Sequence, residues 1–331
     1  QQPQRHRDGH KQLLQHLLMA PIKEFSSADL NTISRLSGVS NVLVKVNGAT
    51  VAASSFSGLL DTYTGAAAAY SVRKLDKDYT GSCMRIVVDS AATVGTLDSS
   101  DPEFDIGFDT NGDLDTAEIV TRCNNPSGTN YNAYVTKWYD QSGNGNDATQ
   151  DQYTAMPQIA STGAVITENG KSALDFSNDY MDTPTITVTD GEFMQTAVYN
   201  NDTNVTNSAV VTMDTVPVRV AQTLSFSNST TIRLLTFNSS GGVDAVIGAS
   251  ATTAGTQTLA TSQVLNGQGE VFVNGSGALR GSVNVRTDQT TIRLGRNVGN
   301  YAMDGRLQEV IHWPSEQTNR SAIETDINNY F

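Results

Sequence analysis

Cysteine is scarce in this chain, which has two cysteines, Cys83 and Cys123, among 331 residues. Two thiols cannot form a disulfide framework, and neither belongs to a Cys-x-x-Cys pair. We therefore expect two small buried thiols in preference to a disulfide bridge. Histidine is almost as rare, and three of the four residues (His6, His10 and His16) lie near the start of the chain. The sequence accordingly shows no pattern typical of Ser-His-Asp, Cys-His or zinc chemistry.

Positive charge is also in short supply, since 21 Lys and Arg residues stand against 34 Asp and Glu residues, which gives a net charge of −13. A surface with this charge repels nucleic acid over most of its area. Apolar runs long enough to span a bilayer are absent from the sequence. We therefore predict neither a nucleic-acid partner nor a membrane partner.

The residues that are abundant favour a β protein. Only 17% of the residues are charged, and Gly, Ser, Thr and Asn are frequent, a composition that suits many strands joined by turns. Beyond about residue 58, apolar and polar residues alternate with a period of two, for example in residues 84–88, 185–188, 231–235 and 271–273. Turns that contain Gly, Asn or Asp separate these segments at intervals typical of a β-sandwich.

The two ends of the chain differ from this middle part. Leu13, Leu14, Leu17 and Leu18 form an apolar stripe in a basic segment, which predicts a short amphipathic helix that docks on a partner or on another copy of the chain. We therefore divide the chain into an anchoring or oligomerisation arm (1–57) and a main domain (58–331). At the other end, Thr318 is predicted to cap a final helix whose apolar face includes residues 322, 323 and 327.

The most distinctive motif is the segment 138–150, which reads WYDQSGNGNDATQ. Two aromatic residues end a strand, and Gly143 and Gly145 permit a tight turn because glycine adopts positive φ readily. The motif resembles the opening part of the catalytic β-sandwich of fungal α-L-arabinofuranosidases of the B type. Together with the segments 58–73, 79–85, 105–116 and 166–171, it is still more similar to a group of phage virion proteins.

The ending of the chain, a turn and strand (304–313) followed by a short helix, is similar to the close of concanavalin-like, laminin-G-type jelly rolls. The resemblances therefore imply an all-β jelly-roll sandwich with a short helical or extended N-terminal arm and a C-terminal helix. They imply a virion protein at the particle surface: a capsid decoration protein, head fibre or tail protein that contacts other virion proteins through the arm. A homo-oligomer is expected, with a trimer as our assumption from other phage fibres.

Catalysis is not expected from the sequence. The arabinofuranosidases carry their nucleophile in an Asn-Ala-Glu context that this chain lacks, and the carboxylates between residues 176 and 230 are sparse (Asp179, Asp182, Asp190, Glu192, Asp202 and Asp214). We find no pair suited to a glycosidase, which needs two carboxyl groups on either side of the scissile bond. We therefore predict that the chain is not an enzyme. The alternatives are an adhesin that binds a host-surface glycan and a secreted arabinofuranosidase-like hydrolase.

Two groups of residues could bind ligands. Trp138, Tyr139, Asp140, Asn144 and Asn146 have the aromatic rings and polar groups that bind sugars, but they also suit a turn that braces itself, and we favour this structural role.

Asp109, Asn111, Asp113 and Asp115 place oxygen atoms at alternate positions, as the first half of a calcium loop does. The glycine is at the fourth position instead of the sixth, and Val120 stands where a calcium loop needs Glu. We favour a tight turn followed by a helix that Asp115 caps, and we expect no cofactor, with calcium as the alternative.

Overall fold

The computed structural model describes residues 43–46, 49–52, 56–90, 97–187, 192–203, 206–215, 222–228, 231–237, 243–250, 252–283, 289–297, 301–315 and 317–331. The chain divides into two compact units, Gln1–Phe56 and Ser57–Phe331. In the first unit, β1 (Leu43–Val46) and β2 (Ala49–Ala52) pair in antiparallel orientation. The predicted arm helix with Leu13, Leu14, Leu17 and Leu18 lies outside the described residues.

The second unit consists mostly of strands, with a few short helices. Its first half contains α3 (Leu59–Thr62), β3 (Ala68–Ser71), β4 (Met84–Val88), β5 (Glu103–Ile106), α4 (Thr116–Arg122), β6 (Ala133–Trp138), β7 (Ala148–Thr149), the 3₁₀ helix η1 (Tyr153–Ala155), β8 (Gln158–Ser161), β9 (Ala164–Val165), β10 (Thr167–Glu168), β11 (Lys171–Ser172) and β12 (Leu174–Ser177). Its second half contains β13 (Met181–Thr187), β14 (Phe193–Asn201), β15 (Ala209–Thr215), β16 (Gln222–Asn228), β17 (Thr231–Phe237), β18 (Val243–Ser250), β19 (Thr258–Leu265), β20 (Gln268–Val273), β21 (Ser276–Ser282), β22 (Gln289–Leu294), β23 (Asp304–Trp313) and α5 (Arg320–Tyr330).

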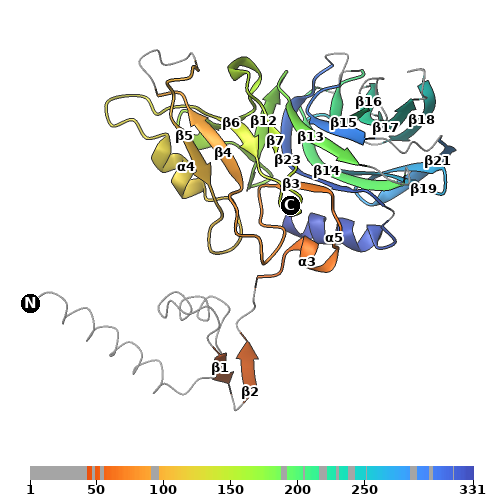
Figure 1. Cartoon of the computed structure of the whole chain (residues 1–331), viewed down its shortest axis with the longest axis horizontal. Helices are drawn as coiled ribbons and strands as arrows, with labels where there is room; N and C mark the ends of the chain where they lie inside the picture. The colour runs from red at the N-terminus through yellow and green to blue at the C-terminus, as the bar shows by residue number, and fades with distance from the viewer. Residues whose placement is uncertain are drawn as a thin grey trace, which may run out of the picture. The chain divides into compact units, whose positions relative to one another are not determined.

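The strands form two layers of antiparallel pairs (Figure 1). One layer runs in the order β5, β4, β6, β8, β12, β23, β14, β19, β20 and β21, and β3 also pairs with β23. The other layer runs in the order β13, β22, β15, β16, β17 and β18. The short strand β7 pairs with both β6 and β13 and so connects the layers. This arrangement confirms the prediction of an all-β sandwich of jelly-roll type.

The main hydrophobic core lies between the layers. Its largest fully buried side chains include Trp138, Tyr70, Tyr199, Phe176 and Phe226. Burial of apolar side chains contributes about 25 cal/mol per Å² of surface removed from water, so aromatic residues of this size dominate the stabilisation.

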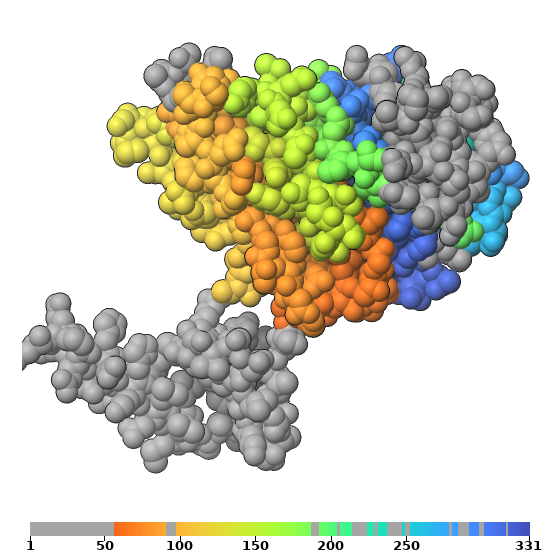
Figure 2. Space-filling model, in the orientation of Figure 1, coloured from red at the N-terminus to blue at the C-terminus, as the bar shows by residue number. Residues whose placement is uncertain are grey.

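A second apolar cluster joins the first layer to α3 and α5. Trp313 packs there with Leu59, Ile323 and Ile327, and its indole Nε1 donates a hydrogen bond to the carbonyl of Tyr63 at 3.2 Å. On the surface, the orange beginning of this unit and its dark blue C-terminal helix therefore adjoin (Figure 2). Helix α5 therefore packs against both the last strand, β23, and α3 at the start of the unit.

Local predictions are confirmed in two places and corrected in one. Cys83 and Cys123 are buried free thiols, and the Asp115 carboxylate caps α4 by accepting a hydrogen bond from the backbone N–H of Glu118. The predicted cap of the last helix is wrong: α5 has Asn319 at its N-cap position, not Thr318, and the Asn319 side chain makes no capping bond. Helix ends are the least determined part of a sequence pattern, because several neighbouring polar residues can begin the helix.

Candidate functional site

The recognisable loop after Trp138 is held together by its own side chains. The Asp140 carboxylate, which is 4% exposed, accepts hydrogen bonds from the backbone N–H groups of Ala69 (2.9 Å), Ser142 (2.9 Å) and Asn146 (3.0 Å). It also accepts one from the Ser142 hydroxyl at 2.7 Å. A carboxylate with four donors is fully engaged in bracing the turn.

The other residues that we considered for sugar binding are placed as follows. Trp138 is fully buried, and its Nε1 donates to the carbonyl of Ser71 at 3.4 Å. The Tyr139 hydroxyl donates to Asp105 at 2.7 Å, and the side-chain amides of Asn144 and Asn146 donate to the carbonyls of Ala66 (2.9 Å) and Ala67 (2.7 Å). These contacts show how the loop is braced. Sugar binding by this group stays a prediction.

The acidic segment that we compared with a calcium loop forms a turn. The Asp109 carboxylate accepts hydrogen bonds from the backbone N–H groups of Asn111 (2.7 Å) and Asp113 (3.0 Å). The Asp113 carboxylate accepts one from the Tyr330 hydroxyl and pairs with Lys171 at 3.5 Å, while Asp115 caps α4. Within the described parts of the chain, no group of three or more His, Cys, Asp or Glu side chains is arranged to hold a metal ion.

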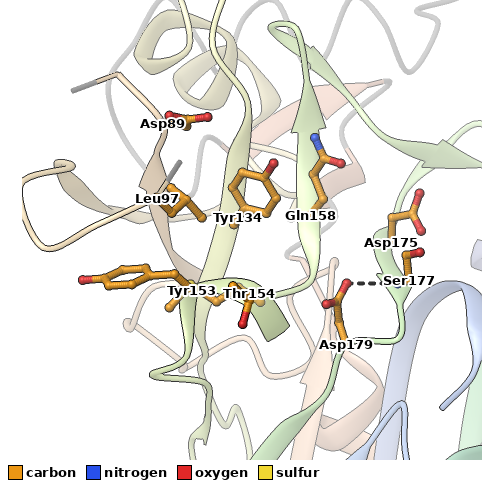
Figure 3. A pocket seen from close by; sticks show the side chains of 10 residues that line it. Asp89, Leu97, Tyr134, Tyr153, Thr154, Gln158, Asp175, Ser177 and Asp179 are labelled. Atoms are coloured by element: carbon orange, nitrogen blue, oxygen red, sulfur yellow. Dashed lines mark hydrogen bonds between the residues drawn. The ribbon is translucent and has the colours of Figure 1, made fainter. Parts of the chain in front are cut away.

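A cavity of about 400 Å³ lies on the first layer where β6, β8 and β12 adjoin (Figure 3). The helix η1 and the ends of β4 and β12 complete its walls. The residues that line it are mainly polar: Asp89, Leu97, Tyr134, Tyr153, Thr154, Met156, Gln158, Asp175, Ser177 and Asp179.

Strand register places three of these residues in one row. Tyr134 on β6 is opposite Gln158 on β8, and Gln158 is opposite Asp175 on β12. Asp175 is in turn opposite Arg306 on β23. Residues directly opposite each other have their side chains on the same face of the sheet. Because their chain neighbours belong to the core between the layers, this polar row faces outward: the neighbours are Val135, Ile159, Leu174, Phe176 and Leu307.

Two carboxyl groups in the cavity have perturbed acidities. The pKa of Asp179 is raised to about 7, mainly by burial; the negative charge of Asp175 adds to the rise, and the hydrogen bond from the Ser177 N–H and the charge of Arg296 oppose it. The Ser177 N–H donates to the Asp179 carboxylate at 3.0 Å (Figure 3). Burial also raises the pKa of Asp175, with Arg306 opposing it and Asp202 and Asp304 adding to it. At neutral pH, Asp179 is therefore partly protonated.

Our sequence analysis mentioned Asp179 among scattered carboxylates and missed its pairing with Asp175. A signal for Asp175 was present, because it stands between the apolar residues Leu174 and Phe176 in a strand, and alternation directs it away from the core. No local pattern shows that β8 lies beside β12, which is what brings Gln158 and Tyr134 to the same cavity.

Comparisons with known proteins identify the fold. No family model matches the sequence, and no match is found among curated proteins. The structure is similar to a GH54 α-L-arabinofuranosidase soaked with a cyclic sulfate inhibitor, with 15% identity, a TM-score of 0.54, and coverage of 82% of this chain and 64% of that chain. It is also similar to an arabinofuranosidase complexed with arabinofuranosyl-α-1,2-xylobiose, with 18% identity, a TM-score of 0.54 and the same coverage. The chain thus spans 64% of the length of these structures.

A weaker likeness, on which no argument rests, is to Trypanosoma rangeli sialidase in complex with 2,3-difluoro-KDN. The identity is 16% and the TM-score 0.42, over 57% of this chain and 30% of that chain.

The comparisons confirm part of the predicted resemblance and correct one prediction. The resemblance to the arabinofuranosidase sandwich is confirmed as a likeness of fold, whereas the comparisons lend no support to the resemblance to phage virion proteins. The prediction that the chain is not an enzyme is contradicted, because the solved structures to which it is similar are glycoside hydrolases. That prediction depended on a motif search, which could not show that Asp175 and Asp179 line one cavity.

Proposed function

We propose that the large unit is a glycoside hydrolase that binds an uncharged sugar in the cavity across β6, β8 and β12. The observation that carries the proposal is the presence of two carboxyl groups, Asp175 and Asp179, in one sugar-sized cavity where their acidities are perturbed. Most glycosidases use a pair of carboxyl groups in which one gives a proton and the other acts as a carboxylate.

Asp179 is suited to the role of proton donor. A general acid works best when its pKa is near the operating pH, because it is then protonated and still gives up its proton readily. Asp179, with a pKa of about 7, meets this condition. It would protonate the oxygen of the leaving sugar as the glycosidic bond breaks.

Asp175 is suited to the role of the second carboxylate. Arg306, its cross-strand neighbour, opposes the rise in its pKa and so favours the ionised form. It would then act as a nucleophile or activate a water molecule. In glycosidases, carboxyl groups about 5–5.5 Å apart retain the anomeric configuration, and a separation of about 6.5–9.5 Å inverts it.

The other lining residues suit an uncharged sugar. The rings of Tyr134 and Tyr153 offer apolar faces, and Gln158, Thr154 and Ser177 offer hydrogen-bonding groups. Three Asp residues and no Lys, Arg or His are among the described lining residues, so a sugar with its own carboxylate would be repelled. A volume of about 400 Å³ lies in the range of ligand pockets, about 300–1,000 Å³.

The test is hydrolysis of a panel of nitrophenyl glycosides, beginning with the α-L-arabinofuranoside that the fold suggests. We expect Asp179→Asn to reduce kcat/KM by about 10²–10⁴-fold, and Asp175→Asn to reduce it comparably. Asp78→Asn is the matched control, because its side chain is exposed and pairs with neighbouring Lys77. Full activity in the Asp179→Asn variant, or no hydrolysis of any neutral glycoside, would overturn the proposal.

The virion setting is a separate proposal. The likeness to phage proteins predicts a chain at the particle surface, bound to other virion proteins through residues 1–57 and assembled as an oligomer. An enzyme displayed in this way would act on glycans of the host surface. Detection of the chain in purified particles by mass spectrometry supports this setting, and its absence from particles removes it.

A further inference from the structure

The chain segment that carries Asp179 contacts an arginine that follows the distant strand β22. Tyr180 directly follows Asp179, and the Arg296 guanidinium lies over its ring, with Cζ 3.5 Å from the ring centroid. Arg293 also lies over this ring, at 4.9 Å, but Arg293 is bound to Asp182 by two hydrogen bonds of 2.6 and 2.8 Å. The buried Nε of Arg296 has no hydrogen-bond partner among the described residues.

The backbone around this contact is closely packed. Gly295 has a φ of +82°, and a Cβ atom there would lie 2.3 Å from Cδ1 of Phe176 and 3.0 Å from the carbonyl oxygen of Asp179. Any larger residue would push the end of β22 away from Asp179.

Tyr180 is fixed through both of its backbone polar groups. Its N–H donates to the carbonyl of Ala155 at 3.3 Å, and its carbonyl accepts from the Gln150 side chain at 2.8 Å. The ring is therefore a rigid platform on which the arginine rests.

We propose that Arg296 is a positioning residue, stacked on Tyr180 so that its positive charge stays beside the Asp179 carboxyl group and favours the ionised form. A guanidinium over an aromatic ring is attracted by the electrons of the ring face, which holds the charge in place without an ion pair. The arginine thus counteracts part of the rise in the pKa of Asp179 that burial and the negative charge of Asp175 cause. Without it, the carboxyl group would hold its proton more tightly.

The charged and titratable groups around Asp179 come from several elements. Asp175 is on β12 and Arg296 follows β22. Tyr134 is on β6, and its pKa is raised mainly by burial, then by the charges of Asp89 and Asp179. Asp89, which follows β4, lines the same cavity. A variant at Arg296 changes the only cation that acts on Asp179 among these described groups.

The decisive experiment measures Asp179 in the free protein by ¹³C NMR of carboxyl carbons over a pH titration. We expect Arg296→Met to raise the pKa of Asp179 by about one pH unit, the effect of losing a nearby opposite charge. Arg296→Lys, which keeps the charge, should shift it much less. Arg85→Met is the control, because Arg85 pairs with Asp105 on another strand and at the surface. An unchanged titration of Asp179 in a folded Arg296→Met protein overturns the proposal, as does an equal shift in the Arg85→Met variant.

Tyr180→Leu gives a second measurement should Arg296→Met fail to fold. It keeps the charge but removes the platform, and we expect an upward shift between those of the lysine and methionine variants; no shift would contradict a role for stacking. The catalytic consequence rests on the proposed function: the alkaline limb of kcat/KM should move upward together with the Asp179 titration. If the NMR shift is found in a chain that hydrolyses no glycoside, the positioning role stands and the proposed function fails.

Discussion

Two acidic, polar regions of this molecule look alike in composition and differ in what their polar groups contact. In the loop after Trp138, Asp140 accepts four hydrogen bonds. Gln141 accepts from the N–H of Leu75 and donates to the carbonyls of Ser71 and Arg73. In the cavity on β12, Asp179 accepts a hydrogen bond from the Ser177 N–H, lines the cavity together with Asp175, and has Arg296 among the charges that act on it.

The difference separates a region that builds the fold from one that is available for chemistry. Where polar side chains satisfy one another, they stabilise a unique conformation and have little capacity left for a ligand. Where carboxyl groups are partly buried with few partners, their acidity shifts and they can exchange protons with a substrate. The more conspicuous motif in the sequence is therefore the structural one.

The largest effect that we expect comes from Asp140→Ala. The substitution leaves four donors around a buried site without an acceptor, which should lower the free energy of unfolding by about 4 kcal/mol. Urea unfolding measures it, and Asp78→Ala, at an exposed position outside the loop, is the control. A loss below about 1 kcal/mol would mean that the loop is not the structural region of the comparison.

A buried histidine extends the comparison to a polar side chain that has no hydrogen-bond partner among the described residues and is shielded from solvent. His312 is fully buried and stacked on Phe193, and both of its ring nitrogens lack hydrogen-bond partners in the described part of the chain. Burial lowers its pKa from 6.5 to about 4. Below pH 6.5 the unfolded chain takes up a proton that the folded chain refuses, so stability falls as the pH drops from 6.5 to about 4.

Because of His312, the free energy of unfolding should fall by about 3 kcal/mol between pH 6.5 and about 4. His312→Phe should remove this contribution to the pH dependence. The measurement is the free energy of unfolding of both proteins at several pH values between 4 and 7. Parallel pH dependences in the two proteins would show that His312 does not titrate in this range.

The third prediction concerns the effect of Asp179 ionisation on the free energy of unfolding of the protein. Because the pKa of Asp179 is raised from 3.8 to about 7, its ionisation opposes folding increasingly as the pH rises through this interval, and the penalty is complete above it. Asp179→Asn should therefore stabilise the protein at pH 8 by about 1–2 kcal/mol, a figure reduced for partial contact with solvent. At pH 3 the gain should vanish.

Thermal unfolding of Asp179→Asn at both pH values tests this prediction, with Asp78→Asn as the control. A variant that loses both stability and activity at pH 8 would place Asp179 among the structural carboxylates.

The smallest effect is expected from calcium. The Asp109 and Asp113 carboxylates already bind backbone N–H groups, Tyr330 and Lys171, so replacing EDTA with about 5 mM calcium should change the free energy of unfolding by less than about 0.3 kcal/mol. A larger stabilisation that Asp109→Asn removes would show that this turn is a calcium site.

Several features followed from local sequence because they depend on neighbouring residues alone. Gly143 and Gly145 have φ values of +85° and +73°, as the predicted tight turn requires. Asp115 caps α4, and alternation located strands such as β4 and β22. The role of Trp138 as a core residue was also within reach, since a large aromatic residue that ends an apolar strand is usually buried.

The candidate site could not be found in this way. Tyr134, Gln158 and Asp175 belong to three strands, and their common row depends on the register of two pairings. Arg296 is more than a hundred residues from Tyr180 in the chain, and nothing near either residue predicts their contact.

The sequence by itself determined the class of fold, the turns and the helix cap, because alternation, glycine conformations and capping are set within a few residues. Tertiary structure alone decided which acidic residues line a cavity and which brace a loop. Strand pairing brings distant segments to within about 5 Å of each other, and the burial that results sets the pKa of a carboxyl group. Asp140 and Asp179 are the same kind of residue, and only the groups folded around them give them different roles.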